Sequence, residues 1–229
     1  MKLTTHTLKF KYLNRGYRES IALLPGWATD CRIFESLDLK FNYILPEEGF
    51  PHFFDESLCD FIKQHNLSKI SILGWSLGGF VGVEFATKHP DLIDELILVS
   101  IREEYKKESL TEIENNLRKS KEGFLYKFYK QCFYKKENMI KYKKIFKDLR
   151  SRFELDYLLD TLDYLSKTQI SFQSLGEISK IKIIHGRYDE IAPIDEARNI
   201  SEKLKGAEFI EIDGCGHIPF LEANLAKYI

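Results

Sequence analysis

The stretch Ile70-Ser71-Ile72-Leu73-Gly74-Trp75-Ser76-Leu77-Gly78-Gly79 decides the fold class of this chain. It begins as a short apolar strand and runs through G-x-S-x-G into the pattern of an amphipathic helix. In that context the serine is held in a sharp, strained turn, and Gly74 and Gly78 remove the side chains that would collide there. A glycine-rich structural turn is the alternative, but the strand before and the helix after favour a functional serine. We therefore predict that Ser76 is a nucleophile at a helix amino end, where the helix dipole favours a developing oxyanion.

A serine hydroxyl is a poor nucleophile without a base, and in enzymes with such an elbow the acid and then the histidine follow along the chain. His217, on a Gly-flanked loop after the last apolar run, is the predicted base. Asp189 lies just past the end of another strand pattern and is the predicted acid. Asp213, four residues before His217, is the rival acid, although we expect it to stabilise its own turn. His185 is interpreted as a structural residue within its strand.

The loop Leu23-Leu24-Pro25-Gly26-Trp27 follows an early strand pattern. Such a loop supplies the second half of an oxyanion hole in elbow-type hydrolases. Gly26 permits a close approach, so the backbone N–H of Trp27 is expected to pair with that of Leu77. The indole of Trp27 is expected either to cover the mouth of the pocket or to serve only in packing.

Seven apolar or alternating runs predict strands, and helical patterns lie between them. The predicted strands are residues 8–13, 21–24, 41–45, 70–73, 96–99, 181–184 and 209–212, and the helices are about 55–65, 76–88 and 193–204. Gly16 is expected in a hairpin turn after the first strand. Because parallel neighbours need helical crossovers, this alternation predicts an α/β fold with a mostly parallel sheet flanked by helices.

Residues 101–168 break this alternation, since they are rich in Lys, Glu, Leu, Tyr and Phe at helical spacing. They predict an all-helical cap, or lid, inserted between two core strands. The expected organisation is therefore a core of residues 1–100 and 169–229 and a cap of residues 101–168.

Composition sets the class of protein. The chain has 229 residues, of which 44% are hydrophobic and 30% charged, as expected of one soluble globular protein. It contains no apolar run of roughly 20 residues and no secretory leader pattern, so we expect a cytoplasmic protein without a membrane partner. The four cysteines lack metal-type spacing and are expected to be reduced thiols.

The net charge of −1 hides a basic segment, because residues 118–152 carry 13 Lys/Arg against 3 Asp/Glu. This segregation favours a face that meets an acidic partner, the alternative being a solvated helical surface. We expect no nucleic-acid partner and a monomeric chain.

Four segments together resemble the α/β-hydrolase superfamily: Leu24–Trp27, Gly74–Gly79, His185–Asp189 and Gly214–Phe220. The resemblance extends over both flanks of the cap, about 160 residues. Within the superfamily, the early Gly-Trp and the elbow Gly-Trp-Ser-Leu-Gly-Gly resemble the BioH-type pimeloyl-[acyl-carrier protein] methyl ester esterases of biotin synthesis. Those enzymes hydrolyse a methyl ester at the far end of an acyl chain held by acyl carrier protein.

This resemblance implies a serine carboxylesterase that needs neither a metal nor an organic cofactor. It implies substrate contacts from Trp27, Ser76, Leu77 and His217, and from the cap stretch Phe124-Leu125-Tyr126-Lys127-Phe128. Basic cap residues in that family face the acidic carrier, which fits the charge of residues 118–152. The alternatives are an esterase or thioesterase on small free esters, a relative that abstracts a proton in menaquinone synthesis, and a non-catalytic receptor on the same fold.

Overall fold

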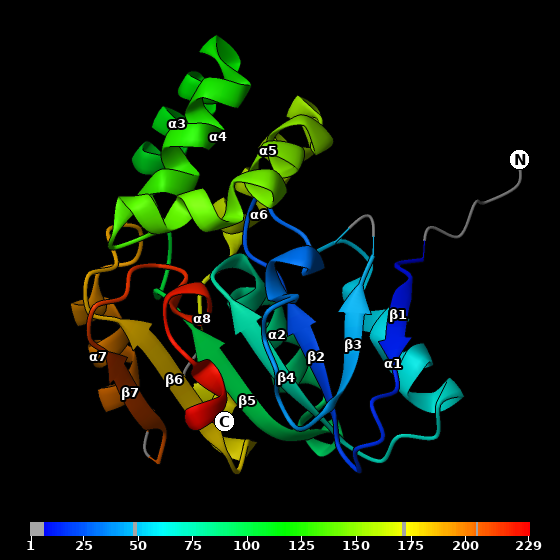
Figure 1. Ribbon diagram of the computed structural model, residues 1–229. Coiled ribbons are helices and arrows are strands. Elements are labelled where there is room, and N and C mark those ends of the chain that lie inside the picture. The colour runs from blue at the N-terminus through cyan, green and yellow to red at the C-terminus, as the bar shows by residue number, and fades with distance from the viewer. Residues whose placement is uncertain (1–6, 48–49, 171–172, 205) are drawn as a thin grey trace, which may run out of the picture.

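A seven-stranded sheet forms the centre of the computed structural model, which describes residues 7–47, 50–170, 173–204 and 206–229 (Figure 1). The strand order is β1-β3-β2-β4-β5-β6-β7, with β1 antiparallel to β3 and every other neighbouring pair parallel. The strands are β1 (Phe10–Leu13), β2 (Ser20–Leu24), β3 (Asn42–Pro46), β4 (Ile70–Trp75), β5 (Ile93–Val99), β6 (Ile181–Gly186) and β7 (Glu208–Ile212). The predicted α/β fold with a mostly parallel sheet is confirmed.

The expected hairpin at Gly16 is wrong. β1 pairs with β3, placing Phe10 opposite Pro46, while β2 lies on the other side of β3. Gly16 does occupy a turn, with φ at +83°, but that turn carries the chain past β3. The Asn42 side chain accepts hydrogen bonds from the backbone N–H groups of Arg15 and Tyr17 at 2.8 and 3.2 Å, which ties the turn to the start of β3. A turn residue predicts the local reversal only, because strand pairing is decided by distant partners.

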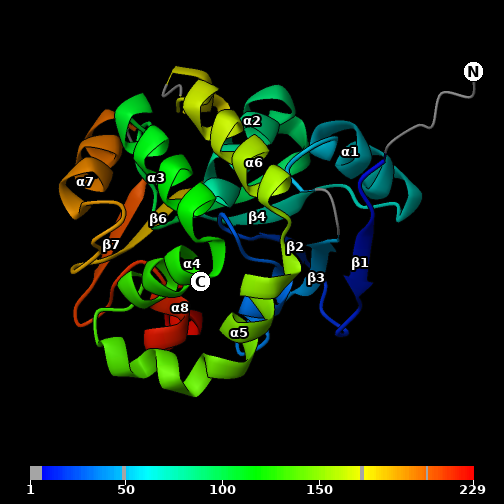
Figure 2. The ribbon, with the colours of Figure 1, turned by 90° about the horizontal axis from the view of Figure 1, so that it is seen from above.

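Helices cover both faces of the sheet. α1 (Phe54–Gln64), α2 (Leu77–Lys88) and α7 (Ile194–Lys203) lie along one face, and α8 (Pro219–Glu222) lies on the other (Figure 2). The central strands are consequently apolar on both sides, and every residue from Ile21 to Leu24 is completely buried. Among the described residues, no helix combines the length and the apolar character needed to cross a bilayer.

Within the described part of the chain, four α-helices lie between β5 and β6 in the sequence and above the carboxyl ends of the strands (Figure 1). They are α3 (Lys107–Lys119), α4 (Lys121–Gln131), α5 (Lys143–Arg152) and α6 (Leu155–Lys167), and a 3-10 segment, Lys136–Tyr142, precedes α5. We call this group the cap helices. Each buries an apolar stripe, marked by Leu117 in α3, Leu125 in α4, Phe146 in α5 and Leu158 in α6. The cap helices therefore join the hydrophobic core directly above the edge of the sheet where parallel-sheet sites lie.

Candidate active site

Ser76 occupies the sharp turn between β4 and α2. Its φ is +53°, a left-handed value that is strained for a residue with a side chain. A Cβ on Gly74 would lie 2.4 Å from the carbonyl oxygen of Gly78, and one on Gly78 would lie 2.2 Å from that of Leu24. Only glycine fits at either position. The backbone N–H of Ser76 also donates to Val99 at 3.0 Å, which fixes the turn against β5.

The structure brings Ser76, His217 and Asp189 together from three loops at the carboxyl edge of the sheet. Nε2 of His217 lies 3.0 Å from Oγ of Ser76, and its Nδ1 lies 2.7 Å from Oδ2 of Asp189. All three are buried, with exposed fractions of 5% for Ser76, 0% for His217 and 8% for Asp189. Because a carboxylate only accepts, Nδ1 carries the proton of a neutral imidazole and Nε2 can accept the serine proton.

Donors surround the carboxylate of Asp189. Its Oδ1 accepts from the backbone N–H groups of Ile191 and Ala192, both at 2.8 Å. Its Oδ2 also lies 3.2 Å from Nε2 of His185, which is 2.8 Å from the carbonyl oxygen of Ala192. Burial alone raises the pKa of Asp189, but the charge of His217 and the hydrogen bonds from His185 and His217 outweigh it and hold the pKa below its usual range. Asp189 is therefore an anion at neutral pH.

The rival acid Asp213 is directed elsewhere. Its side chain is 72% exposed and pairs with Arg187 at 3.3 Å. The loop carrying His217 is instead held by Trp75 of the elbow, whose indole N–H donates to the carbonyl oxygen of His217 at 2.7 Å. The structure thus places Asp189, and not Asp213, against His217.

The loop after β2 packs against the elbow. A Cβ on Gly26 would lie 2.8 Å from the Trp75 ring, so glycine is needed for this approach. The next residue, Trp27, is 6% exposed, and its indole N–H donates to the carbonyl oxygen of Leu158 in α6 at 3.2 Å. The indole therefore lies beneath the cap helices and ties this loop to them.

The predicted cap stretch 124–128 is divided between two sides of α4. The Phe124 and Phe128 rings lie 6.5 and 5.2 Å from the Trp27 ring, and Leu125 is fully buried. Tyr126 is 46% exposed, with the Arg150 guanidinium 5.3 Å from its ring, and Lys127 is exposed as well. The structure does not bring these last two residues to the site. Five consecutive helical residues turn through more than a full circle, so they cannot all face one pocket.

Tyr105 is a site residue that the sequence patterns did not single out. Its side chain lies near that of Ser76, and burial raises the pKa of its phenol to about 12. Its ring centroid lies 6.0 Å from that of Phe80. Tyr105 lies six residues after β5, and this position beyond a strand's carboxyl end was the available signal.

A family model described as the alpha/beta hydrolase fold matches residues 15–148, more than half of the chain. The chain belongs to this family. This α/β hydrolase is 25% identical in sequence to the pimeloyl-[acyl-carrier protein] methyl ester esterase of Chromobacterium violaceum, and the alignment covers 90% of each chain. It is 24% identical to the protein of the same name from Nitrosomonas europaea, over 90% of this chain and 91% of the relative.

Solved structures support the same fold. An esterase from Exiguobacterium antarcticum superposes on this α/β hydrolase with a TM-score of 0.82 at 18% identity, covering 94% of this chain and 90% of its own. A bromoperoxidase from Bacillus anthracis gives the same TM-score and identity over 96% and 91%. The named relatives and neighbours include esterases and other hydrolases, which supports the expectation of a carboxylic ester hydrolase.

Proposed function

We propose that this α/β hydrolase is a serine carboxylesterase in which Ser76 is the nucleophile, His217 the base and Asp189 the acid. The observation that carries the proposal is the continuous contact from Oγ of Ser76 through the His217 ring to Asp189, 3.0 Å at one end and 2.7 Å at the other. Nothing in binding alone requires a buried serine, histidine and carboxylate in this order, so the contact favours an enzyme over a receptor built on the same fold.

In the proposed reaction, Oγ of Ser76 attacks the ester carbonyl carbon while Nε2 of His217 takes its proton. The imidazolium is stabilised by the Asp189 carboxylate, to which Nδ1–H still donates. Nε2–H then protonates the departing alkoxide, leaving an acyl group on Ser76. A water that gives its proton to Nε2 attacks the acyl carbon, and Nε2–H then returns a proton to Oγ of Ser76 as the carboxylic acid is released.

We assign the oxyanion hole to the backbone N–H groups of Trp27 and Leu77. Leu77 is the first residue of α2, so its N–H has no partner in the preceding turn of that helix. Trp27 follows Gly26, whose packing against Trp75 brings the loop to the elbow. Donors at these two places would meet the negative charge that develops on the carbonyl oxygen of the substrate.

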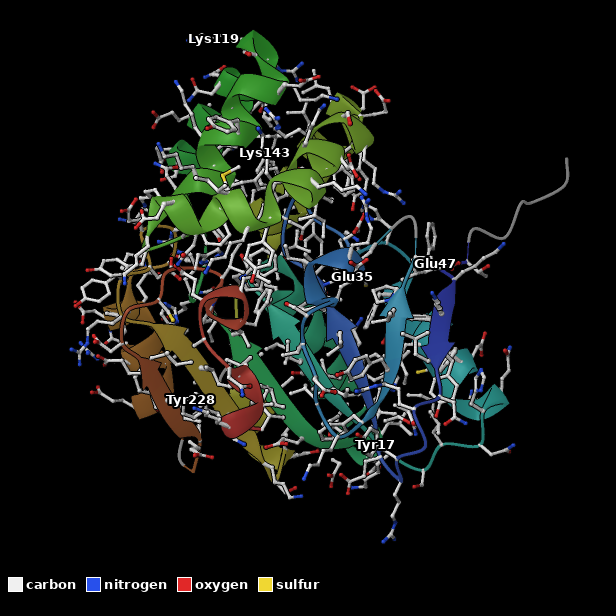
Figure 3. The ribbon with its side chains drawn as sticks, in the orientation of Figure 1. Tyr17, Glu35, Glu47, Lys119, Lys143 and Tyr228 are labelled. Carbon is white, nitrogen blue, oxygen red and sulfur yellow. The ribbon has the colours of Figure 1, made fainter. Side chains whose placement is uncertain are left out.

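For the substrate, we propose the methyl ester of a pimeloyl chain on acyl carrier protein. Two relatives whose sequences align with 90% of this chain carry that activity in their names. The rings of Trp27, Phe124 and Phe128 supply an apolar cover beside the site, suited to an acyl chain. The cap helices carry exposed basic side chains, among them Lys119 and Lys143, that are suited to an acidic carrier (Figure 3).

The proposal is tested with a p-nitrophenyl ester and a fluorophosphonate probe on the purified protein. We expect Ser76→Ala to abolish labelling and to lower kcat/KM by on the order of 10⁴ or more, because the proposed triad loses its nucleophile. Ser100→Ala is the matched control: Ser100 is also fully buried and follows the neighbouring strand, but among the described residues its hydroxyl has no hydrogen-bond partner. Labelling or most of the turnover surviving in folded Ser76→Ala would refute the assignment.

A further inference from the structure

A second group of reactive side chains lies at the far end of α2 from Ser76. Asp55 and Cys59 are one turn apart in α1, and His89 caps the carboxyl end of α2. One potential ligand atom from each lies within 4.8 Å of the other two. Ser76 caps the other end of the same 12-residue helix, so about 18 Å of helix separates this group from the candidate active site.

Both neighbours of His89 approach the same ring nitrogen. Nε2 lies 2.8 Å from Oδ1 of Asp55 and 3.5 Å from Sγ of Cys59. If Nε2 carries a proton it serves the carboxylate, and its lone pair is then not available to the thiol. If Nε2 is unprotonated it can accept from the thiol, but it then faces the Asp55 carboxylate without a donor. One proton on Nε2 serves the carboxylate well and the sulfur only weakly, whereas a divalent cation attracts a carboxylate, a thiolate and an imidazole lone pair together.

We propose that Asp55, Cys59 and His89 form a binding site for a divalent transition metal of the zinc class. Zinc binds sulfur at about 2.3 Å and imidazole nitrogen at about 2.0–2.1 Å, so a tetrahedral ion holds these two ligands roughly 3.5 Å apart. The Sγ–Nε2 distance of 3.5 Å already has this value. The Asp55 oxygen, now 2.8 Å from Nε2, must move outward, since a tetrahedral ion would hold these two atoms about 3.4 Å apart, and the fourth position is left for water.

The nearby charge of Lys88 does not block the atoms that would bind the ion. Nζ of Lys88 lies 3.5 Å from Oδ2 of Asp55, while Oδ1 is the oxygen that faces His89. Asp55, Cys59 and His89 are each partly exposed, so an ion can enter from solvent. A carboxylate and a thiolate together balance the charge of a divalent ion.

The expected role is structural. The ion would join the first half of α1 to the end of α2, where His89 is followed by Pro90 and the helix stops. No step of the proposed ester hydrolysis involves these residues. Spacing in the sequence could not predict the site, because only Asp55 and Cys59 are close along the chain and the third ligand comes from another helix.

The test uses Co²⁺ as a spectroscopic probe and Zn²⁺ in calorimetry and thermal unfolding of the full chain. We expect one ion per chain, a thiolate-to-Co²⁺ charge-transfer band in the near ultraviolet, and a higher Tm in the presence of Zn²⁺. Cys59→Ser should remove the band, and Cys59→Ser and His89→Gln should each weaken Zn²⁺ binding about tenfold or more, since even loss of a ligand's supporting partner costs that much. His52→Gln is the matched control, because His52 forms a comparable surface pair with Asp160 at 2.5 Å without the approach of a thiol. It should bind like the wild type.

The proposal is overturned if millimolar Co²⁺ produces no charge-transfer band in the wild type, or if Cys59→Ser and His89→Gln bind as tightly as His52→Gln does. A further measurement does not require any variant to fold. Zn²⁺ should slow alkylation of Cys59 by iodoacetamide, followed by mass spectrometry, without slowing that of Cys31, which lies outside the group. Equal alkylation rates of Cys59 with and without Zn²⁺ would equally exclude the site.

Discussion

Nε2 of His185 lies 3.2 Å from Oδ2 of Asp189, the same oxygen that Nδ1 of His217 contacts at 2.7 Å. The other oxygen, Oδ1, accepts two backbone N–H groups. Among the residues that the structure describes, only donors therefore face the carboxylate, and each of its two oxygens is engaged. This arrangement determines what an amide would do in the same place.

We expect Asp189→Asn to lower kcat/KM by on the order of 10³–10⁴. The amide oxygen would stay on the N–H groups of Ile191 and Ala192, which turns the NH₂ group toward His217. That group can only donate, so Nδ1 would have to become an acceptor and the proton would move to Nε2, where it blocks transfer from Ser76. Steady-state kinetics on a p-nitrophenyl ester measures the loss.

Asp213→Asn is the matched control for this substitution. It removes the same charge four residues from His217, but the side chain is 72% exposed and contacts Arg187. We expect its kcat/KM to stay within about twofold of the wild type, because exposed ion pairs contribute little. A larger loss in Asp213→Asn than in Asp189→Asn would move the acid to the histidine loop.

Tyr105→Phe is expected to lower kcat/KM by about 2- to 10-fold. A phenol near Ser76 can donate to Oγ in the reacting enzyme and keep the serine proton directed at His217, and one such hydrogen bond has a net worth of about 0.5–1.5 kcal/mol. The loss should appear in kcat and not in KM, because the contact orients the nucleophile. Urea unfolding accompanies the kinetics: a lower midpoint with unchanged kcat would mean that Tyr105 only packs.

The seven strands and the three flanking helices could be predicted because each carries its pattern locally. β4, for example, is apolar throughout and is followed at once by the glycines of the elbow. The order of the strands in the sheet could not be predicted in the same way. Gly16 correctly marked a turn, but the partner of β1 is a strand about thirty residues further along, and no local pattern indicates it.

The candidate site shows the same division. Ser76, Asp189 and His217 stand in distinctive local contexts, and the structure brings them together. Tyr105 has no motif of its own, since it comes near Ser76 only once the segment after β5 folds over the elbow. Tyr126 and Lys127 lie on the exposed side of α4, and a stretch of family resemblance does not say which side of a helix each of its residues occupies.

The last prediction concerns the basic cap. Four exposed lysines, at positions 141, 143, 144 and 147, lie in the 3-10 segment before α5 and in α5 itself, and two of them, Lys141 and Lys144, line a surface hollow of about 420 Å³. If an acidic carrier protein docks there, reversing all four to Glu should lower kcat/KM for a carrier-bound methyl ester by tenfold or more, because attraction between unlike charges raises the association rate.

Two comparisons separate docking from a general effect of charge. The control variant reverses four exposed basic residues that precede parallel strands at the opposite edge of the sheet, Arg18, Lys40, Lys69 and Lys180. It makes the same change in net charge and should leave carrier-bound turnover nearly unchanged. A p-nitrophenyl ester needs only the proposed triad and oxyanion hole, so neither variant should alter its turnover by more than about twofold.

Salt provides an independent check on the same proposal. The Debye length is about 8 Å at 0.15 M ionic strength and about 3 Å at 1 M, so added salt should reduce kcat/KM of the wild type toward that of the cap variant for the carrier-bound ester. The small ester should show no such dependence. If both variants and both substrates respond alike, the lysines of the cap form a solvated surface and the carrier must dock elsewhere.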